Sequence, residues 1–212
     1  MKRYFSFFVI VALIVSVVVS SCEKDDGLPV SPVSTLDVKV EDGNDYDNII
    51  NEVRLICYNS NNGNPVTLAI VKYSEGGFKM NLPESIPSSV MENIVDIFEA
   101  DSKIDISKKN SKIAIEIELV AFNKNNEKIG YFFYCKEETD NTYVETLLFY
   151  SDSEVNLTGK ETYENGTEVW NVSLKMGWNQ VFLIEKDLSE DKWEDTFTTK
   201  NQSGLKWYFE YD

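Results

Sequence analysis

Residues 112–122 read KIAIEIELVAF and contain the clearest period-two pattern of this chain. Four apolar side chains alternate with four mostly polar ones, namely Ile113, Ile115, Ile117 and Leu119 with Lys112, Ala114, Glu116 and Glu118. Successive side chains of a β-strand point to opposite faces of its sheet. The pattern therefore predicts a strand in a sheet that has one buried and one wet face.

Similar runs rich in Val, Ile, Phe and Tyr recur at short intervals, at 51–58, 67–73, 77–82, 129–135, 143–150, 168–174, 180–185 and 205–211. Segments rich in Asn and Gly separate them, at 59–65, 75–77, 123–128 and 165–166. Many short strands divided by turn residues predict an all-β fold. We expect an antiparallel β-sandwich, and a lipocalin-like β-barrel is the alternative.

One segment, 88–100, departs from this period. Its apolar residues recur at helical spacing after Pro87, and Ser88 and Ser89 are suited to cap a helix. The sequence therefore predicts one short helix across an end or face of the sheets.

Residues 36–212 are expected to form one β-sandwich domain, which the polar stretch 101–111 could divide into two halves. The chain has 20 Lys and Arg against 36 Asp and Glu, a net charge of −16. Its basic residues are scattered singly or in pairs. Because phosphate binding requires clustered Lys and Arg, nucleic acid is excluded as a partner.

The first 21 residues have the three parts of a secretion signal. Lys2 and Arg3 are followed by a mostly apolar run over 5–19 and by the small residues Ser20 and Ser21. The run is shorter than the roughly 20 residues that a membrane-spanning helix needs. We therefore expect residues 1–21 to be a signal peptide that is removed, which leaves a net charge of −18.

Residues 19–22, VSSC, resemble the lipobox of bacterial lipoproteins. The resemblance implies that Cys22 becomes the first mature residue and carries acyl chains such as palmitate, which hold the protein at a membrane. The alternative is an ordinary secretory signal that leaves Cys22 as a free thiol.

Lys24, Asp25 and Asp26 look like the acidic signal that directs lipoproteins to the outer face of the outer membrane in some Gram-negative bacteria. A solvated tether is the alternative. Residues 22–35 are then the lipidated cysteine and a flexible spacer.

Residues 69–84, AIVKYSEGGFKMNLPE, resemble the strand-turn-strand of transthyretin-like and carboxypeptidase-regulatory-like modules. Residues 147–160, 172–183 and 204–209 look like a pattern of small bacterial surface lipoproteins of unassigned function. The resemblance implies an Ig-like or transthyretin-like sandwich and gives no catalytic residues to transfer.

The sequence has no histidine, which removes Ser-His-Asp and Cys-His catalysis and His-based metal sites. No nucleophile elbow, phosphate loop or dinucleotide motif is present. The acidic run 41–48, EDGNDYDN, has oxygen ligands but does not match the calcium-loop spacing, so we expect a solvated loop. We expect no enzyme, no cofactor and no metal; the less favoured alternative is a glycoside hydrolase that uses two carboxylates.

Three residues are singled out for chemistry besides Cys22. Trp193 lies among charges and is the best candidate for an exposed ring that touches a ligand. Cys57 and Cys135 lie in strand-like runs and either form a disulfide or are two separately buried thiols, the interpretation we favour.

The sequence thus predicts a lipid-anchored protein of the outer membrane that faces the cell exterior. We expect a non-catalytic surface module that binds a glycan or a protein or serves in an assembly. The alternative is a polysaccharide-binding lipoprotein of a nutrient-capture system. A platform of Trp193 with neighbouring Tyr would favour sugar, and a bare strand edge would favour protein.

Overall fold

The computed structural model describes residues 32–59, 62–98, 102–138, 141–189 and 191–212. The predicted signal peptide, Cys22 and the acidic residues that follow it lie outside these described residues. In the described chain, no helix is long and apolar enough to cross a membrane.

The described residues form an all-β protein with three one-turn 3₁₀ helices. The strands are β1 (Thr35–Lys39), β2 (Glu52–Tyr58), β3 (Pro65–Lys72), β4 (Gly77–Asn81), β5 (Glu92–Asn93), β6 (Asp105–Ile106), β7 (Lys112–Ala114), β8 (Ile117–Phe122), β9 (Lys128–Glu138), β10 (Thr142–Ser151), β11 (Val155–Thr162), β12 (Gly166–Leu174), β13 (Gly177–Ser189), β14 (Lys192–Thr198) and β15 (Lys206–Tyr211). The 3₁₀ helices are η1 (Gly43–Tyr46), η2 (Ser88–Val90) and η3 (Ile94–Asp96).

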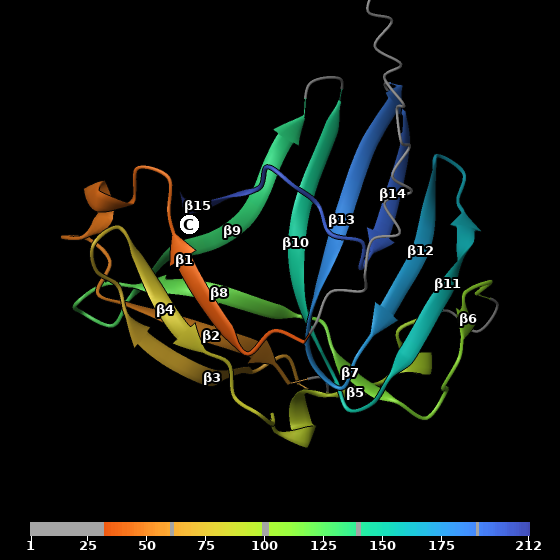
Figure 1. The fold of residues 1–212 in the computed structure, drawn as a ribbon, viewed down its shortest axis with the longest axis horizontal. Helices are drawn as coiled ribbons and strands as arrows, with labels where there is room; N and C mark the ends of the chain where they lie inside the picture. The colour runs from red at the N-terminus through yellow and green to blue at the C-terminus, as the bar shows by residue number, and fades with distance from the viewer. Residues whose placement is uncertain (1–31, 60–61, 99–101, 139–140, 190) are drawn as a thin grey trace, which may run out of the picture.

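Most strands belong to one large sheet in the order β3-β2-β8-β9-β10-β13-β14-β12-β11-β6. In addition, β15 pairs with β9, β7 pairs with β10, and β5 pairs with β7. In Figure 1, β2, β3 and β8 run across the direction of the upright strands β10 to β14, and β9 bends from one group to the other. No pairing between described residues joins β3 to β6, so the sheet does not close into the alternative barrel. The all-β sandwich architecture is confirmed.

One pairing is parallel in this otherwise antiparallel sheet. β12 and β13 follow each other in the chain, but β14 lies between them and runs parallel to β12. The β13–β14 hairpin folds back so that its second strand fills the space beside β12. The sheet is therefore mixed, where the sequence predicted an antiparallel one.

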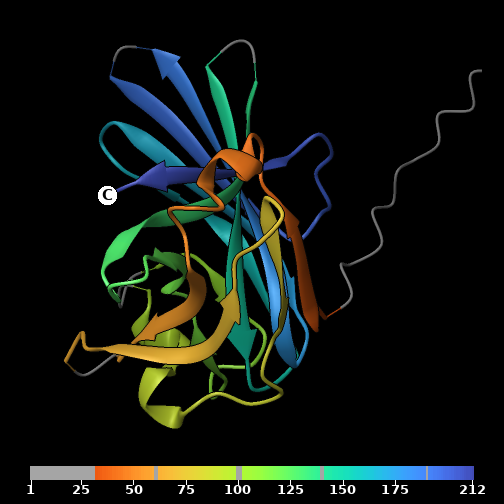
Figure 2. The same cartoon turned by 90° about the vertical axis from the view of Figure 1, so that its left-hand side faces the viewer.

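A second sheet contains only β1 and β4, which pair from Thr35↔Asn81 to Lys39↔Gly77. A tight turn of residues 74–77 carries the chain from β3 to β4, with Glu75 and Gly76 at positive φ. The predicted strand-turn-strand is present, although its two strands belong to different sheets. Figure 2 shows the β1–β4 pair beside the large sheet.

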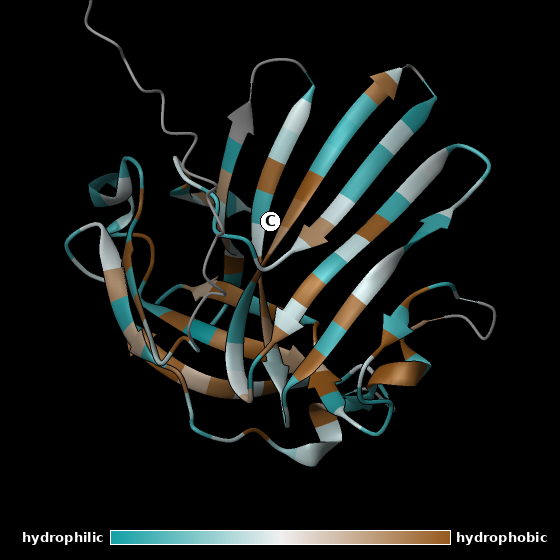
Figure 3. Cartoon of the chain, turned by 45° about the vertical axis from the view of Figure 1, so that its right-hand side comes forward, coloured by the Kyte–Doolittle hydropathy of each residue, from teal (hydrophilic) through white to brown (hydrophobic). Residues whose placement is uncertain are grey.

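The two largest of four hydrophobic clusters among the described residues lie on opposite faces of the large sheet and share β10. The first core fills the space between the β1–β4 pair and strands of the large sheet; it includes Leu36, Val53, Met80, Leu119, Phe132, Leu148, Trp178 and Phe209. The second core lies on the other face of β10 and under β11 to β13; it includes Ile94, Ile113, Phe149, Leu157, Trp170, Val172 and Val181. Along these strands, apolar and polar residues alternate (Figure 3).

The predicted helix over 88–100 is wrong. The segment instead forms η2, the two-residue strand β5 and η3. Val90 packs in the first core while Ile94 packs in the second. Between them the backbone is bound to the sheet, because Glu92 pairs with Ile113 and the N–H of Ile94 donates to Ser111 C=O at 2.9 Å. The chain must be extended to bury these two residues on different sides of the sheet. The stabilisation from this burial outweighs the local preference for a helix that the spacing of the apolar residues indicates.

The single strand predicted over 112–122 is divided. β7 pairs with β10 and β5, whereas β8 pairs with β2 and β9, and residues 115–116 connect them. Ala114, predicted on the wet face, is buried in the first core. The break separates two parts of the sheet and creates the space described next.

Candidate functional site

Strands β8, β9 and β10 enclose an opening in the large sheet. β9 pairs with β8 at one end, at Val120↔Tyr131, and with β10 at the other, at Cys135↔Glu145. The pair Tyr150↔Ala114 closes the third corner through β7. Between these corners, residues 117–119, 132–134 and 146–149 pair on only one side, with β2, β15 and β13 respectively. We call this three-sided opening the aperture.

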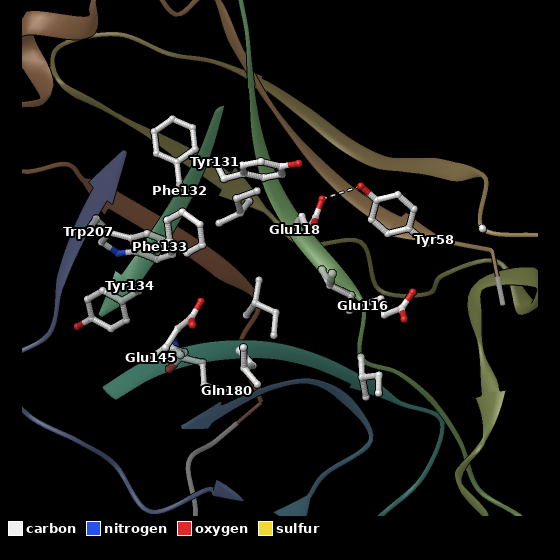
Figure 4. Close-up of a pocket in the computed structure, with 17 residues that line it drawn as sticks. Tyr58, Glu116, Glu118, Tyr131, Phe132, Phe133, Tyr134, Glu145, Gln180 and Trp207 are labelled. Carbon is white, nitrogen blue, oxygen red and sulfur yellow. Dashed lines mark hydrogen bonds between the residues drawn. The ribbon is translucent and has the colours of Figure 1, made fainter. Parts of the chain in front are cut away.

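A pocket of about 720 Å³ occupies the aperture. This volume is within the range of about 300–1,000 Å³ that is typical of small-molecule sites. Its wall comes from all three strands, from Tyr58 and Gly63 near the end of β2, from Gln180 of β13 and from Trp207 of β15. Figure 4 shows these side chains arranged around one space.

Strand alternation divides the wall into two sides. Leu119, Phe132 and Leu148 belong to the first core, so their side chains point to that face of the sheet. Their chain neighbours Glu118 and Phe133 point to the opposite face, as does Glu145, three residues before Leu148. The pocket thus has a floor of core residues and a rim that carries carboxylates and aromatic rings.

The rim carboxylates differ in their surroundings. The hydroxyl of Tyr58 donates a hydrogen bond to Glu118 Oε2 at 2.7 Å. Burial is the largest cause that raises the pKa of Tyr58 to about 12, and the hydrogen bond to Glu118 is the next largest. The hydroxyl of Tyr58 therefore keeps its proton at neutral pH. Burial, and then the charge of Glu185, raises the pKa of Glu145 above its usual range. Burial and the charge of Glu185 thus disfavour the ionised form of Glu145.

Thr146 adds an unsatisfied polar atom to the same wall. Its Oγ1 is buried and has no hydrogen-bond partner. Buried polar atoms in native proteins are nearly always bonded, and one that is not needs an explanation. A ligand in the aperture would supply the missing partner.

A smaller pocket of about 270 Å³ adjoins the first and shares Tyr58, Ile115 and Glu116 with it. Cys57, Glu92 and Asp96 also line it. Burial raises the pKa of Cys57 to about 11, so this thiol is not suited to nucleophilic chemistry. Cys57 and Cys135 are both buried and do not form a disulfide with each other.

Trp193, the residue singled out for ligand contact, lies away from the aperture. Its half-buried ring stacks on Tyr163 at 5.8 Å between centroids, at the far end of β14. The ring also lies so close over Gly166 that a Cβ there would be 2.0 Å from it. Trp193 and Tyr163 form a surface pair that does not line either pocket.

The acidic run 41–48 forms η1 and packs beside the turn before β4, where Asp47 Oδ1 accepts a hydrogen bond from Gly76 N–H at 2.9 Å. In the part of the chain that the structure describes, no group of three or more His, Cys, Asp or Glu is arranged to hold a metal ion.

Sequence reasoning did not identify the aperture residues as a site. Glu118 was placed correctly on the polar face of its strand, but nothing linked it to Glu145. One signal was available, since residues 131–134 read YFFY, four consecutive aromatic residues that cannot all face one core. Such a run indicates a strand with apolar surroundings on both faces, as β9 has at the aperture.

A scan against protein-family models and searches of curated proteins and of solved structures found no match to this chain.

Proposed function

We propose that this chain is a non-catalytic, surface-exposed lipoprotein of a Gram-negative bacterium whose folded part is a binding or assembly module. The lipobox-like residues 19–22 and the acidic residues that follow support the proposed location at the cell surface. The aperture pocket supports binding, and it is the observation on which the proposal depends.

The lipid anchor and the surface location are tested on protein from native cells. Mass spectrometry should find a mature chain that begins at Cys22 and carries fatty acids, and Cys22→Ala should abolish the modification. Protease added to intact cells should digest the protein, and replacing Lys24, Asp25 and Asp26 by Ala should protect it. A chain that keeps residues 1–21, or an unmodified Cys22, would contradict a lipid anchor.

Binding is tested with the mature chain in detergent on a glycan array and against surface proteins of the same cell. Phe133→Ala removes a ring from the aperture rim, and Trp193→Ala removes the surface ring, so the two variants locate any ligand. Loss through Phe133→Ala with retention in Trp193→Ala would support the aperture. A ligand that is lost only in Trp193→Ala would move the site to the Trp193–Tyr163 pair.

The second candidate is a polysaccharide-binding lipoprotein of a nutrient-capture system. It is favoured by the aromatic rings at the aperture, because flat rings suit sugar faces and carboxylates accept hydrogen bonds from hydroxyls. Binding that strengthens with glycan length would support it. Hydrolysis of a bound glycan that Glu145→Gln abolishes would contradict the non-catalytic assignment.

A further inference from the structure

The charged side chains that line the aperture pocket are all acidic. Glu116, Glu118 and Glu145 line it, and none of the other lining residues is Lys, Arg or His. The chain as a whole has a net charge of −16, so the surrounding field has the same sign. Anionic ligands are therefore disfavoured, and a positive ligand would be attracted both at long range and in contact.

Two lysines on the strands around the aperture, Lys128 and Lys206, are paired with other acidic groups. Lys128 Nζ is 2.8 Å from Asp212 and donates a hydrogen bond to the Tyr131 hydroxyl at 2.6 Å. Lys206, on the same face as Glu145 by register, pairs with Glu41 at 3.2 Å. Lys128 also lies 4.6 Å from the centroid of the Tyr131 ring, so a ring at this rim already accepts an ammonium group.

The neutral lining fits an ammonium group with an apolar body. Rings of Tyr131, Phe133, Tyr134 and Trp207 surround the space, and Tyr134 stacks on Trp207 at 4.9 Å between centroids. The buried Thr146 Oγ1 has no partner and can accept an N–H. The Tyr58 hydroxyl already donates its hydrogen bond to Glu118, so it is not available to a further acceptor. A ligand that donates hydrogen bonds suits the carboxylates and the Thr146 hydroxyl.

We infer that the aperture pocket binds a protonated amine with a compact apolar body, the ammonium lying among the rim carboxylates and the body against the rings. This inference rests on the proposed binding function and specifies its ligand class. The ammonium would favour the ionised form of Glu145, which burial and the charge of Glu185 disfavour.

The test uses the mature chain in detergent and two probes of similar shape, benzylamine and benzyl alcohol, measured by isothermal titration calorimetry. We expect benzylamine to bind at least about tenfold more tightly, because only it carries a positive charge that pairs with the rim carboxylates. Glu145→Gln should remove most of this preference, because it weakens benzylamine more than the alcohol. Glu164→Gln, which removes one exposed charge in a distant loop, is the matched control and should retain the preference.

Two further readouts separate a charge effect from a change of shape. Raising the salt from about 0.01 M to about 1 M shortens the screening length from about 30 Å to about 3 Å, and should weaken only benzylamine. Lowering the pH through the raised pKa of Glu145 should weaken benzylamine in the parent chain, since Glu145 takes up a proton, and less so in Glu145→Gln.

The outcomes distinguish the inference from the proposed function. Equal affinity for both probes, with both lost in Phe133→Ala, would overturn the amine inference and leave the aperture as a binding site. Absence of benzylamine binding would also overturn it. A neutral glycan that binds independently of salt and is lost in Phe133→Ala would refute the amine class while supporting the binding function.

Discussion

Asp195→Asn should stabilise this protein at neutral pH. Asp195 lies in a row of four carboxylates on neighbouring strands, which pair in the order Glu161↔Glu168, Glu168↔Asp195 and Asp195↔Glu185. Directly opposed side chains point to the same face, and neighbouring strands are about 4.8 Å apart. Like charges in this arrangement repel, so removing the central charge relieves two contacts.

The size of the effect follows from the pKa of Asp195. Burial, followed by the charges of Glu185, Glu168 and Asp187, raises this pKa from its usual 3.8 to about 6. One pKa unit corresponds to about 1.4 kcal/mol, so the upper limit is about 3 kcal/mol. Because solvent screens a partly exposed carboxylate, we expect a gain of about 1 kcal/mol, or roughly 2–4 °C in Tm for a domain of this size.

The stability gain of Asp195→Asn should depend on pH in a direction that follows from the raised pKa of Asp195. The pKa is raised in the folded state, so folding disfavours the ionised form. The penalty is absent below the ordinary pKa of 3.8, develops between 3.8 and about 6, and is complete above it. The advantage of Asp195→Asn should therefore be full at about pH 7.5 and vanish near about pH 3.5.

Thermal unfolding followed by circular dichroism at these two pH values is the assay. Asp191→Asn, in the exposed turn before β14, removes the same charge outside the row and should leave Tm unchanged. An Asp195→Asn variant that melts at or below the parent at neutral pH, or whose gain persists in acid, would refute the repulsion argument.

Three further changes test the packing. Gly166→Ala should destabilise the protein by about 1–3 kcal/mol in urea unfolding, since the new Cβ would be 2.0 Å from the Trp193 ring; an unchanged midpoint would show that this ring moves freely. Trp178→Phe should cost about 1–3 kcal/mol, because Trp178 Nε1 donates to Pro83 C=O at 2.7 Å in the core, and a neutral result would mean that water replaces the bond. Cys57 should resist a thiol reagent at about pH 8 until urea unfolds the chain, since burial raises its pKa to about 11; rapid labelling of the native state would contradict its burial.

The sequence was sufficient to predict strands whose apolar residues alternate or cluster. The runs at 51–58 and 143–150 correspond to β2 and β10. It was not sufficient for β11 and β14, which read VNLTGKET and KWEDTFT and contain more polar than apolar residues. β14 is a strand because it fills the position between β12 and β13, where both of its edges are paired. That is a property of the assembled sheet, which a local pattern does not contain.

The candidate site shows the same limit. Glu118 and Glu145 are 27 positions apart in the chain, and no spacing rule joins them. They share a pocket because β9 is long enough to pair with β8 at one end and β10 at the other while bending between them (Figure 1). Trp193 was singled out by the charges around it, and the structure places it in a surface pair instead.

The aperture exists because residues 112–122 contribute side chains to two different cores. Ile113 must lie in the second core and Leu119 in the first, so residues 112–122 cannot stay in one flat strand and break at 115–116. That break directs β7 toward β10 and β8 toward β2, and the strand edges between them remain unpaired. In this opening the buried Thr146 hydroxyl is left without a partner, which costs free energy. Replacing Thr146 by Val, which keeps the shape and removes the hydroxyl, should therefore leave stability unchanged or raise it in the empty protein, and should weaken the binding of any ligand that donates to it.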